Sequence, residues 1–189
     1  TDKGYPKQLA DSDNSLMGFG ATYEVNDTTQ LFFGFHEGFT PTGGGADPEQ
    51  ADNLEMGVRY SDDNSYFEAV YFDTDYQNMF GECTASGGAT GSCEIGDSFN
   101  AGEASISGFE LVAQTEMASD SGTKYPLSMV YTSTDASFDN TFDSDFWGSV
   151  TSGMDIPDLP DSQLALQAGF ETQSGLKGSA TYYAYGSTC

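Results

Sequence analysis

Positively charged side chains are scarce in this chain, which carries four lysines and one arginine against 30 aspartates and glutamates, for a net charge of −25. Nucleic acid is therefore excluded as a partner, because phosphate binding requires clustered lysine and arginine. No run approaches the about 18 consecutive apolar residues of a membrane-spanning helix. Aromatic residues make up 14% of the chain, more than a disordered acidic segment carries. The acidic residues are spread over predicted loops, which favours a solvated surface over a cation-capturing one.

Cysteine is also sparse, with three residues in the chain. Cys83 and Cys93 bracket a loop rich in glycine and serine, and no histidine or further cysteine lies nearby to complete a zinc site. We predict a disulfide between Cys83 and Cys93 that pins an extracellular loop, which requires an oxidising compartment. Cys189 is left over, and we expect its partner to lie beyond the end of the chain.

The sequence patterns of catalysis are missing. There is no Gly-x-Ser-x-Gly elbow and no cluster of metal ligands at a known spacing, and the one histidine, His36, has no cysteine in a suitable position. We therefore predict that the chain is not an enzyme and holds no catalytic residues.

Alternating apolar and polar residues, the pattern of β-strands, recur in eight segments. These segments are residues 15–25, 30–39, 54–61, 66–80, 105–118, 124–138, 163–172 and 176–186. One face is apolar and the other is small, polar or charged, except in 66–80, which is aromatic on both faces and whose orientation stays open. Most segments reach the about 9–11 residues that a tilted strand needs to cross a bilayer.

The joints between these segments are of two kinds. Tight polar turns at 26–29, 62–65, 120–123 and 173–175 alternate with long excursions at 40–53, 81–104 and 139–162. Outer-membrane barrels keep short turns at the periplasmic end and long loops outside, whereas a soluble β-sandwich has no reason to do so. The pattern predicts an all-β antiparallel meander of about eight transmembrane strands around a wet lumen. Alternation alone leaves open a soluble, Ca²⁺-binding or adhesive β-domain.

Candidate ligand-binding residues lie in the predicted lumen and loops. His36 and Arg59 fall on the lumen-facing register, where a lone histidine is more often a satisfied polar residue than a ligand. Arg59 shares this face with Glu55, and we predict an ion pair between them. Phe146 and Trp147, in an extracellular loop, would either cover a ligand or pack the loop down. Two acidic clusters could offer oxygen ligands to Ca²⁺ without matching an EF-hand: Asp139, Asp143 and Asp145, and Asp47, Glu49 and Asp52.

Several motifs follow one another in an order and spacing that resemble the TonB-dependent outer-membrane receptors. The first is Phe35-His36-Glu37-Gly38-Phe39-Thr40-Pro41, and the second is Pro48-Glu49 followed by Asn53-Leu54-Glu55-Met56-Gly57-Val58-Arg59-Tyr60. The match continues in residues 75–78, 81–84, 99–103, 106–110 and 156–163. Together with the cysteine-bracketed loop, the arrangement is most similar to the branch that contains ferric-citrate receptors.

The resemblance implies that residues 1–189 are a piece of an outer-membrane β-barrel of about 22 strands, without its plug domain and its last strands. Such a receptor lies in the outer membrane of a Gram-negative bacterium and imports a ferric chelate or siderophore. Its partners would be the remainder of the barrel, the plug, membrane lipid and the TonB–ExbB–ExbD energy-transducing complex. No resident cofactor is expected, since the iron chelate is cargo. Uptake of another nutrient, such as a glycan or cobalamin, is the alternative, because these loops are acidic and ferric citrate is an anion.

Overall fold

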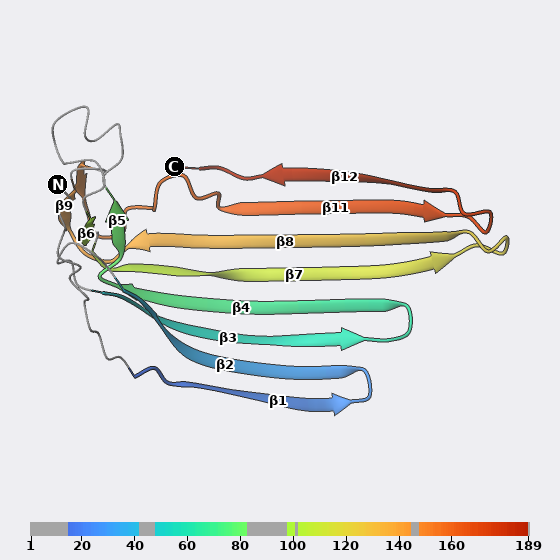
Figure 1. Ribbon diagram of the computed structural model, residues 1–189, viewed down its shortest axis with the longest axis horizontal. Coiled ribbons are helices and arrows are strands. Elements are labelled where there is room, and N and C mark those ends of the chain that lie inside the picture. Colours follow the sequence, from blue (N-terminus) through green and yellow to red (C-terminus); the bar gives the residue numbers. More distant parts are fainter. Residues whose placement is uncertain (1–14, 42–47, 83–97, 101, 145–147, 189) are drawn as a thin grey trace, which may run out of the picture.

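The chain forms one antiparallel sheet in the computed structural model, which describes residues 15–41, 48–82, 98–100, 102–144 and 148–188. The eight strands of this sheet are hydrogen-bonded in the order β1-β2-β3-β4-β7-β8-β11-β12 (Figure 1). Their bounds are β1 (Gly18–Asn26), β2 (Thr29–Thr40), β3 (Glu49–Ser61), β4 (Ser65–Gln77), β7 (Ala104–Ala118), β8 (Lys124–Phe138), β11 (Ser162–Glu171) and β12 (Lys177–Tyr185). Each strand therefore pairs with the next long strand in the sequence, and the predicted meander is confirmed.

The short turns all lie at one end of the sheet, here called the turn end, and the long connections at the other, the loop end (Figure 1). Polar side chains stabilise the turns by accepting backbone hydrogen bonds. The amide of Thr28 donates to Asn26 Oδ1 over 2.9 Å, and the amides of Asn64 and Ser65 donate to Asp62 Oδ1 over 2.9 and 2.7 Å. A hydrogen bond from the Tyr60 hydroxyl is the largest cause that holds the pKa of Asp62 below its usual value, and the backbone bonds from Asn64 and Ser65 act in the same direction.

The long connections contain secondary structure that alternation did not predict. Two small hairpins lie there, formed by β5 (Phe80–Glu82) with β6 (Ser98–Asn100) and by β9 (Phe142–Ser144) with β10 (Gly148–Val150). Beyond β10 the chain returns along β8, where the amide of Phe138 donates to the Met154 carbonyl and that of Ile156 to the Ala136 carbonyl. The long connection after β10 is therefore attached to β8 by backbone hydrogen bonds.

One face of the sheet, the apolar face, carries a belt of apolar side chains in which alanines lie among larger residues. The strand registers place on it Phe19, Ala21, Tyr23, Leu31, Phe33, Phe35, Leu54, Met56, Val58, Tyr60, Phe67, Ala69, Tyr71, Phe109, Leu111, Ala113, Met117, Tyr125, Leu127, Met129, Tyr131, Leu164, Leu166, Ala168, Phe170, Ala180, Tyr182 and Ala184. On β7 the belt runs from Phe109 to Met117, about 26 Å along the strand. Nearer the loop end this face turns acidic, with Asp52, Asp73, Asp75 and Asp135.

The opposite face, the polar face, holds mostly small, hydrogen-bonding and charged side chains. It includes Thr22, Gln30, Phe32, His36, Asn53, Glu55, Arg59, Tyr66, Glu68, Phe72, Thr74, Glu110, Gln114, Glu116, Lys124, Ser128, Thr132, Gln163, Gln167, Glu171, Lys177, Ser179 and Thr181. The registers also settle the orientation of β4, which the sequence left open: Phe67 and Tyr71 lie on the apolar face, and Tyr66 and Phe72 on the polar face.

The sheet is a single layer, so little of it is buried. Among the described residues the buried hydrophobic side chains are Ala104, Phe138 and Val150, which gather at the loop end with Phe142 and Met154 packed against them. The apolar belt stays open, with Phe19, Phe109 and Tyr182 each more than half exposed. A water-soluble monomer rarely exposes an apolar surface of this extent. The described part of the chain contains no helix long and apolar enough to span a membrane.

Candidate functional site

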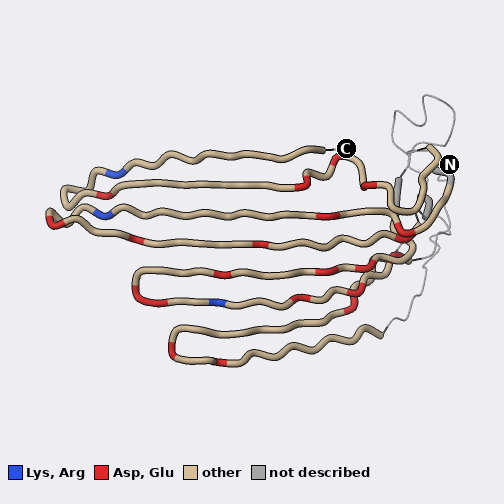
Figure 2. The backbone as a smooth tube through the Cα atoms, turned by 180° about the vertical axis from the view of Figure 1, so that it is seen from behind, with Lys and Arg blue, Asp and Glu red and all other residues tan. Residues whose placement is uncertain are grey.

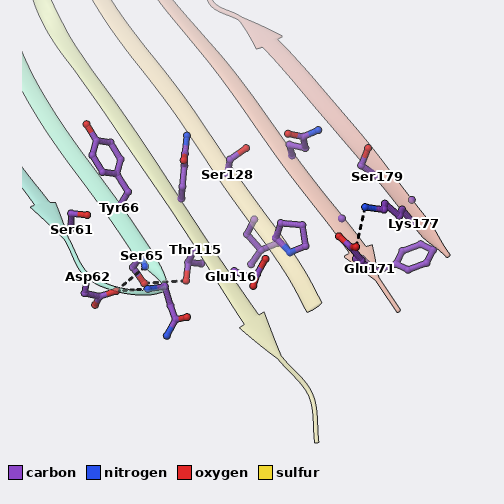
Figure 3. A pocket seen from close by; sticks show the side chains of 18 residues that line it. Ser61, Asp62, Ser65, Tyr66, Thr115, Glu116, Ser128, Glu171, Lys177 and Ser179 are labelled. Carbon is purple, nitrogen blue, oxygen red and sulfur yellow. Dashed lines mark hydrogen bonds and ion pairs between the residues drawn. The ribbon is translucent and has the colours of Figure 1, made fainter. Parts of the chain in front are cut away.

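A pocket of about 830 Å³ lies at the turn end, against the polar face (Figure 3). Its floor is a row of uncharged hydrogen-bonding side chains at one height on neighbouring strands, because the registers pair Tyr66 with Gln114, Gln114 with Ser128, and Ser128 with Gln167. Glutamine and serine offer both donors and acceptors. The pocket can therefore hold a polar, uncharged surface.

Two ion pairs lie at the rim of this turn-end pocket. Lys124 Nζ lies 2.7 Å from Glu116 Oε1, and Lys177 Nζ lies 2.9 Å from Glu171 Oε1 (the second pair is dashed in Figure 3). Lys124 and Glu171 are also direct cross-strand partners, so the two pairs are adjacent. Each of the two lysines is compensated by a glutamate, and the lining also includes the carboxylate of Asp62, so the pocket does not favour anions.

Arg59 lies nearer the middle of the polar face and is held by four neighbours, one of which is Gln30, whose Oε1 accepts a hydrogen bond from Arg59 Nη1 over 3.3 Å. It forms an ion pair with Glu68, its Nε donates to the Tyr66 hydroxyl over 3.0 Å, and its guanidinium lies 5.2 Å from the centre of the Phe32 ring. The Tyr66 hydroxyl in turn donates to Glu68 Oε2 over 2.7 Å. The network is closed, so Arg59 has little capacity left to bind an anionic ligand.

The predicted pairing of Arg59 with Glu55 is wrong. Glu55 is on the same strand and face, but four residues along a strand correspond to about 13 Å. Glu68 lies directly opposite Arg59 on β4. The turn at 62–65 could have revealed this, because a tight hairpin that pairs 62 with 65 also pairs 59 with 68.

Nearer the loop end, the polar face presents His36 and two exposed carboxylates. Asn53 lies between β2 and β4, donating to the His36 carbonyl over 3.4 Å and accepting from the Thr74 hydroxyl over 2.9 Å. Glu55 and Glu110 lie on the same face and are exposed, and within the described ranges no ion pair joins either of them to a cation. This region is therefore negative.

Charge is distributed unevenly along the sheet. Figure 2 shows the described lysines and arginine in the turn-end part of the strands, while aspartates and glutamates continue to the loop end. The three cations Arg59, Lys124 and Lys177 are all paired. In the part of the chain with described placement, these cations therefore leave the exposed carboxylates Glu55 and Glu110, nearer the loop end, without an ion pair.

Several predicted site residues lie outside the described residues: Phe146 and Trp147, the cysteines Cys83, Cys93 and Cys189, and Asp47 and Asp145 of the acidic clusters. His36 and Arg59 lie on the polar face, and a ligand-binding role for them stays a prediction. Where placement is described, no three histidine, cysteine or carboxylate side chains gather closely enough to hold a metal ion. A loop Ca²⁺ site also stays a prediction.

The sequence did not point to Glu68, Tyr66 or the glutamine row as parts of one surface. Tyr66 and Glu68 fall in the segment that is aromatic on both faces, where alternation gives no orientation. Glutamines and serines scattered over three strands become neighbours only through the register.

A single antiparallel meander with an apolar belt on one face, a polar opposite face and turns segregated from long loops defines the wall of an outer-membrane β-barrel. A family model described as TonB dependent receptor-like, beta-barrel matches residues 3–188. The chain therefore belongs to the TonB-dependent receptors, a family of outer-membrane nutrient receptors rather than enzymes. A search of curated proteins gave no match. Membership implies a plug domain and an interaction with TonB in the full protein, and it makes the polar face the lumen side and the turn end the periplasmic side.

Proposed function

We propose that the chain forms part of the barrel wall of a receptor that imports an iron(III) chelate of neutral or positive overall charge. The observation that carries this proposal is the pair of exposed lumen carboxylates, Glu55 and Glu110, on a wall whose three described cations are all engaged. Iron chelates are among the scarce nutrients that justify active transport, and the resemblance to ferric-citrate receptors supports iron as the cargo.

The charge of the cargo follows from electrostatics. At a wet surface one carboxylate costs a nearby anion on the order of 1 kcal/mol. A lumen lined by unpaired carboxylates also repels anions over longer distances and raises the local concentration of cations. Ferric citrate, although it belongs to the branch that the sequence resembles, is for this reason a poorer candidate than an uncharged or cationic chelate.

The turn-end pocket supports a second part of the proposal, the placement of the plug. Its uncharged row of Gln114, Ser128 and Gln167 matches the donors and acceptors of a polypeptide surface, and Lys124 and Lys177 beside it are already paired with glutamates. We propose that the plug packs against this region, leaving the carboxylate-bearing part of the lumen nearer the loop end to the cargo.

Uptake of radioactive iron tests the cargo. Cells in which the complete receptor is the only transporter are given iron as an anionic, a neutral or a cationic chelate. We expect faster TonB-dependent uptake of the neutral or cationic chelates. Preference for ferric citrate, or uptake of a glycan or cobalamin with no iron uptake, contradicts the proposal.

Removing the carboxylates sharpens this experiment. The double variant Glu55→Gln, Glu110→Gln is expected to raise uptake of the anionic chelate about fivefold for each carboxylate that lies near the anion, the equivalent of on the order of 1 kcal/mol apiece. Asp73→Asn is the matched control, because Asp73 lies on the opposite face of the sheet. An equal effect of Asp73→Asn would mean that general surface charge, rather than the lumen, sets the preference.

A further inference from the structure

Two phenylalanines of the polar face lie over glycines of the neighbouring strand. A Cβ at Gly108 would lie 2.7 Å from Phe72 Cζ, and one at Gly57 would lie 2.5 Å from Phe32 Cζ. In each case the phenylalanine and the glycine are direct cross-strand partners, on β4 and β7 for the first pair and on β2 and β3 for the second. Since glycine has no side chain, each ring can lean across the neighbouring strand, and each ring is only half-buried, with one side toward the lumen.

The two pairs occupy equivalent places in the sheet. β2 and β4 run from the turn end toward the loop end, and β3 and β7 run in the opposite direction. Two residues after the glycine, toward the turn end and on the same face, lies Arg59 on β3 and Glu110 on β7. The sheet therefore contains the same arrangement twice, once with a cation beside the ring and once with a carboxylate.

The Phe32 arrangement shows what such a ring can hold. The guanidinium of Arg59 lies 5.2 Å from the centre of the Phe32 ring, and Glu68 on the next strand forms an ion pair with it. A cation in this position is attracted by the face of the ring as well as by the carboxylate. The chain's own cation therefore occupies this ring.

The Phe72 arrangement has the ring and two carboxylates, and no described cation pairs with either of them. Glu55 on β3 is the direct cross-strand partner of Phe72, and Glu110 lies diagonally across from it on β7. Direct partners have Cβ atoms about 5 Å apart and diagonal neighbours lie about 7–8 Å apart, so both carboxylates can reach a group that lies on the ring. Both are exposed to the lumen.

We propose that Phe72, Glu55 and Glu110 form a subsite for an organic ammonium group carried by the cargo. This inference rests on the proposed function and makes it more specific, since it assigns the positive charge to a pendant amine of the chelate rather than to the iron centre. Phe72 provides the selectivity, because an aromatic face recognises ammonium groups in water, whereas carboxylates alone would attract any cation.

Binding of a simple organic cation tests the subsite independently of the cargo. The complete receptor is prepared with para-fluorophenylalanine in place of Phe72 and titrated with tetramethylammonium chloride while its fluorine NMR signal is recorded. We expect a saturable shift that sodium chloride at the same concentration does not produce. Glu55→Gln and Glu110→Gln are each expected to weaken this binding about fivefold.

The same label in place of Phe32 is the matched control for this titration, because Arg59 already lies over that ring. We expect its signal to stay unchanged. Absence of a shift with the label at Phe72, an equal shift with sodium chloride, or equal shifts at both labelled rings overturns the proposal.

Uptake connects the subsite to transport. A linear trihydroxamate chelate of iron(III) that ends in a free amine is positively charged, and its N-acetylated form is neutral. We expect Phe72→Leu to lower uptake of the amine form about two- to fivefold, which corresponds to a cation–π contact at an exposed site, and to leave uptake of the acetylated form unchanged. Phe109→Leu is the matched control, since Phe109 lies on the apolar face. Circular dichroism checks that both variants are folded.

The two proposals fail in different ways. An equal effect of Phe72→Leu on the amine and acetylated chelates overturns the subsite and leaves the proposed function intact. A preference of the wild-type receptor for anionic chelates contradicts the proposed function, and the fluorine NMR titration still decides whether the subsite binds ammonium groups.

Discussion

The Arg59 network shows how one side chain on the polar face can fix the relative positions of two strands. Removing Arg59 leaves Glu68, which is largely shielded from water, without its cation. We predict that Arg59→Ala lowers the free energy of unfolding of the complete receptor by about 1–2 kcal/mol. This value is lower than that of a fully buried charge-assisted hydrogen bond, because the Arg59 side chain is partly exposed. Arg59→Lys is expected to recover less than half of this lost stability, because lysine lacks the planar guanidinium that bonds several partners at once and lies over the Phe32 ring. Urea unfolding in detergent measures both variants.

A surface ion pair provides the comparison for this prediction. Lys177 and Glu171 are bonded over 2.9 Å, but the lysine side chain is 67% exposed. Lys177→Ala is therefore expected to cost less than about 0.5 kcal/mol. If Arg59→Ala and Lys177→Ala shift the urea midpoint equally, the closed network around Arg59 contributes no more than an ordinary surface pair.

The sequence predicted the face of Arg59 correctly and its partner incorrectly, and the reason is physical. Alternation has a period of two residues, so it assigns a face but does not state which residue lies opposite. The partner follows from the turn that joins the strands. The same limit applies to Glu55 and Glu110. Their shared face was predictable from alternation, but only the register of the sheet shows that no described cation is paired with either of them.

At the scale of the strand, two glycines of the polar face differ in what surrounds them. A Cβ at Gly57 would meet the Phe32 ring at 2.5 Å and also the Ala69 carbonyl, whereas one at Gly34 would meet nothing within 4 Å. We predict that Gly57→Ala destabilises the complete receptor by about 1–3 kcal/mol through overpacking. Gly34→Ala is expected to be neutral or slightly stabilising, by up to about 1 kcal/mol. Urea unfolding in detergent compares them, and equal losses would mean that glycine is needed at both positions for flexibility rather than space.

The strand ends show where the sequence signal stops. All eight long strands were predicted, and 124–138 has the predicted bounds, but β3 begins at Glu49 rather than at 54. Its first residues lie beyond the apolar belt, where Asp52 and Asn53 place polar side chains on both faces. The apolar–polar alternation therefore disappears in these residues, although hydrogen bonds to β2 and β4 continue the strand through them. The short strands of the loop end were missed for the same reason.

At the scale of the whole molecule, the sheet is open. Within the described residues β1 pairs only with β2 and β12 only with β11, so each outer strand has one row of backbone groups without a strand partner. Such edges pair readily with other chains. Inside a hydrocarbon layer each unsatisfied group costs several kcal/mol. The apolar face therefore requires lipid, the polar face requires the contents of the lumen, and the two edges require further strands.

These requirements predict how the purified 189-residue chain behaves. In water the exposed belt, from Phe19 to Tyr182, and the two edges are expected to drive aggregation, so that size-exclusion chromatography finds no monomer. In detergent the belt is covered, and circular dichroism should show β-structure, although without a single cooperative thermal transition because the edges stay unpaired. Adding the rest of the barrel should restore one sharp transition. A monomer that is soluble without detergent and unfolds cooperatively would show instead that the sheet closes or packs on itself, as expected of a soluble β-domain.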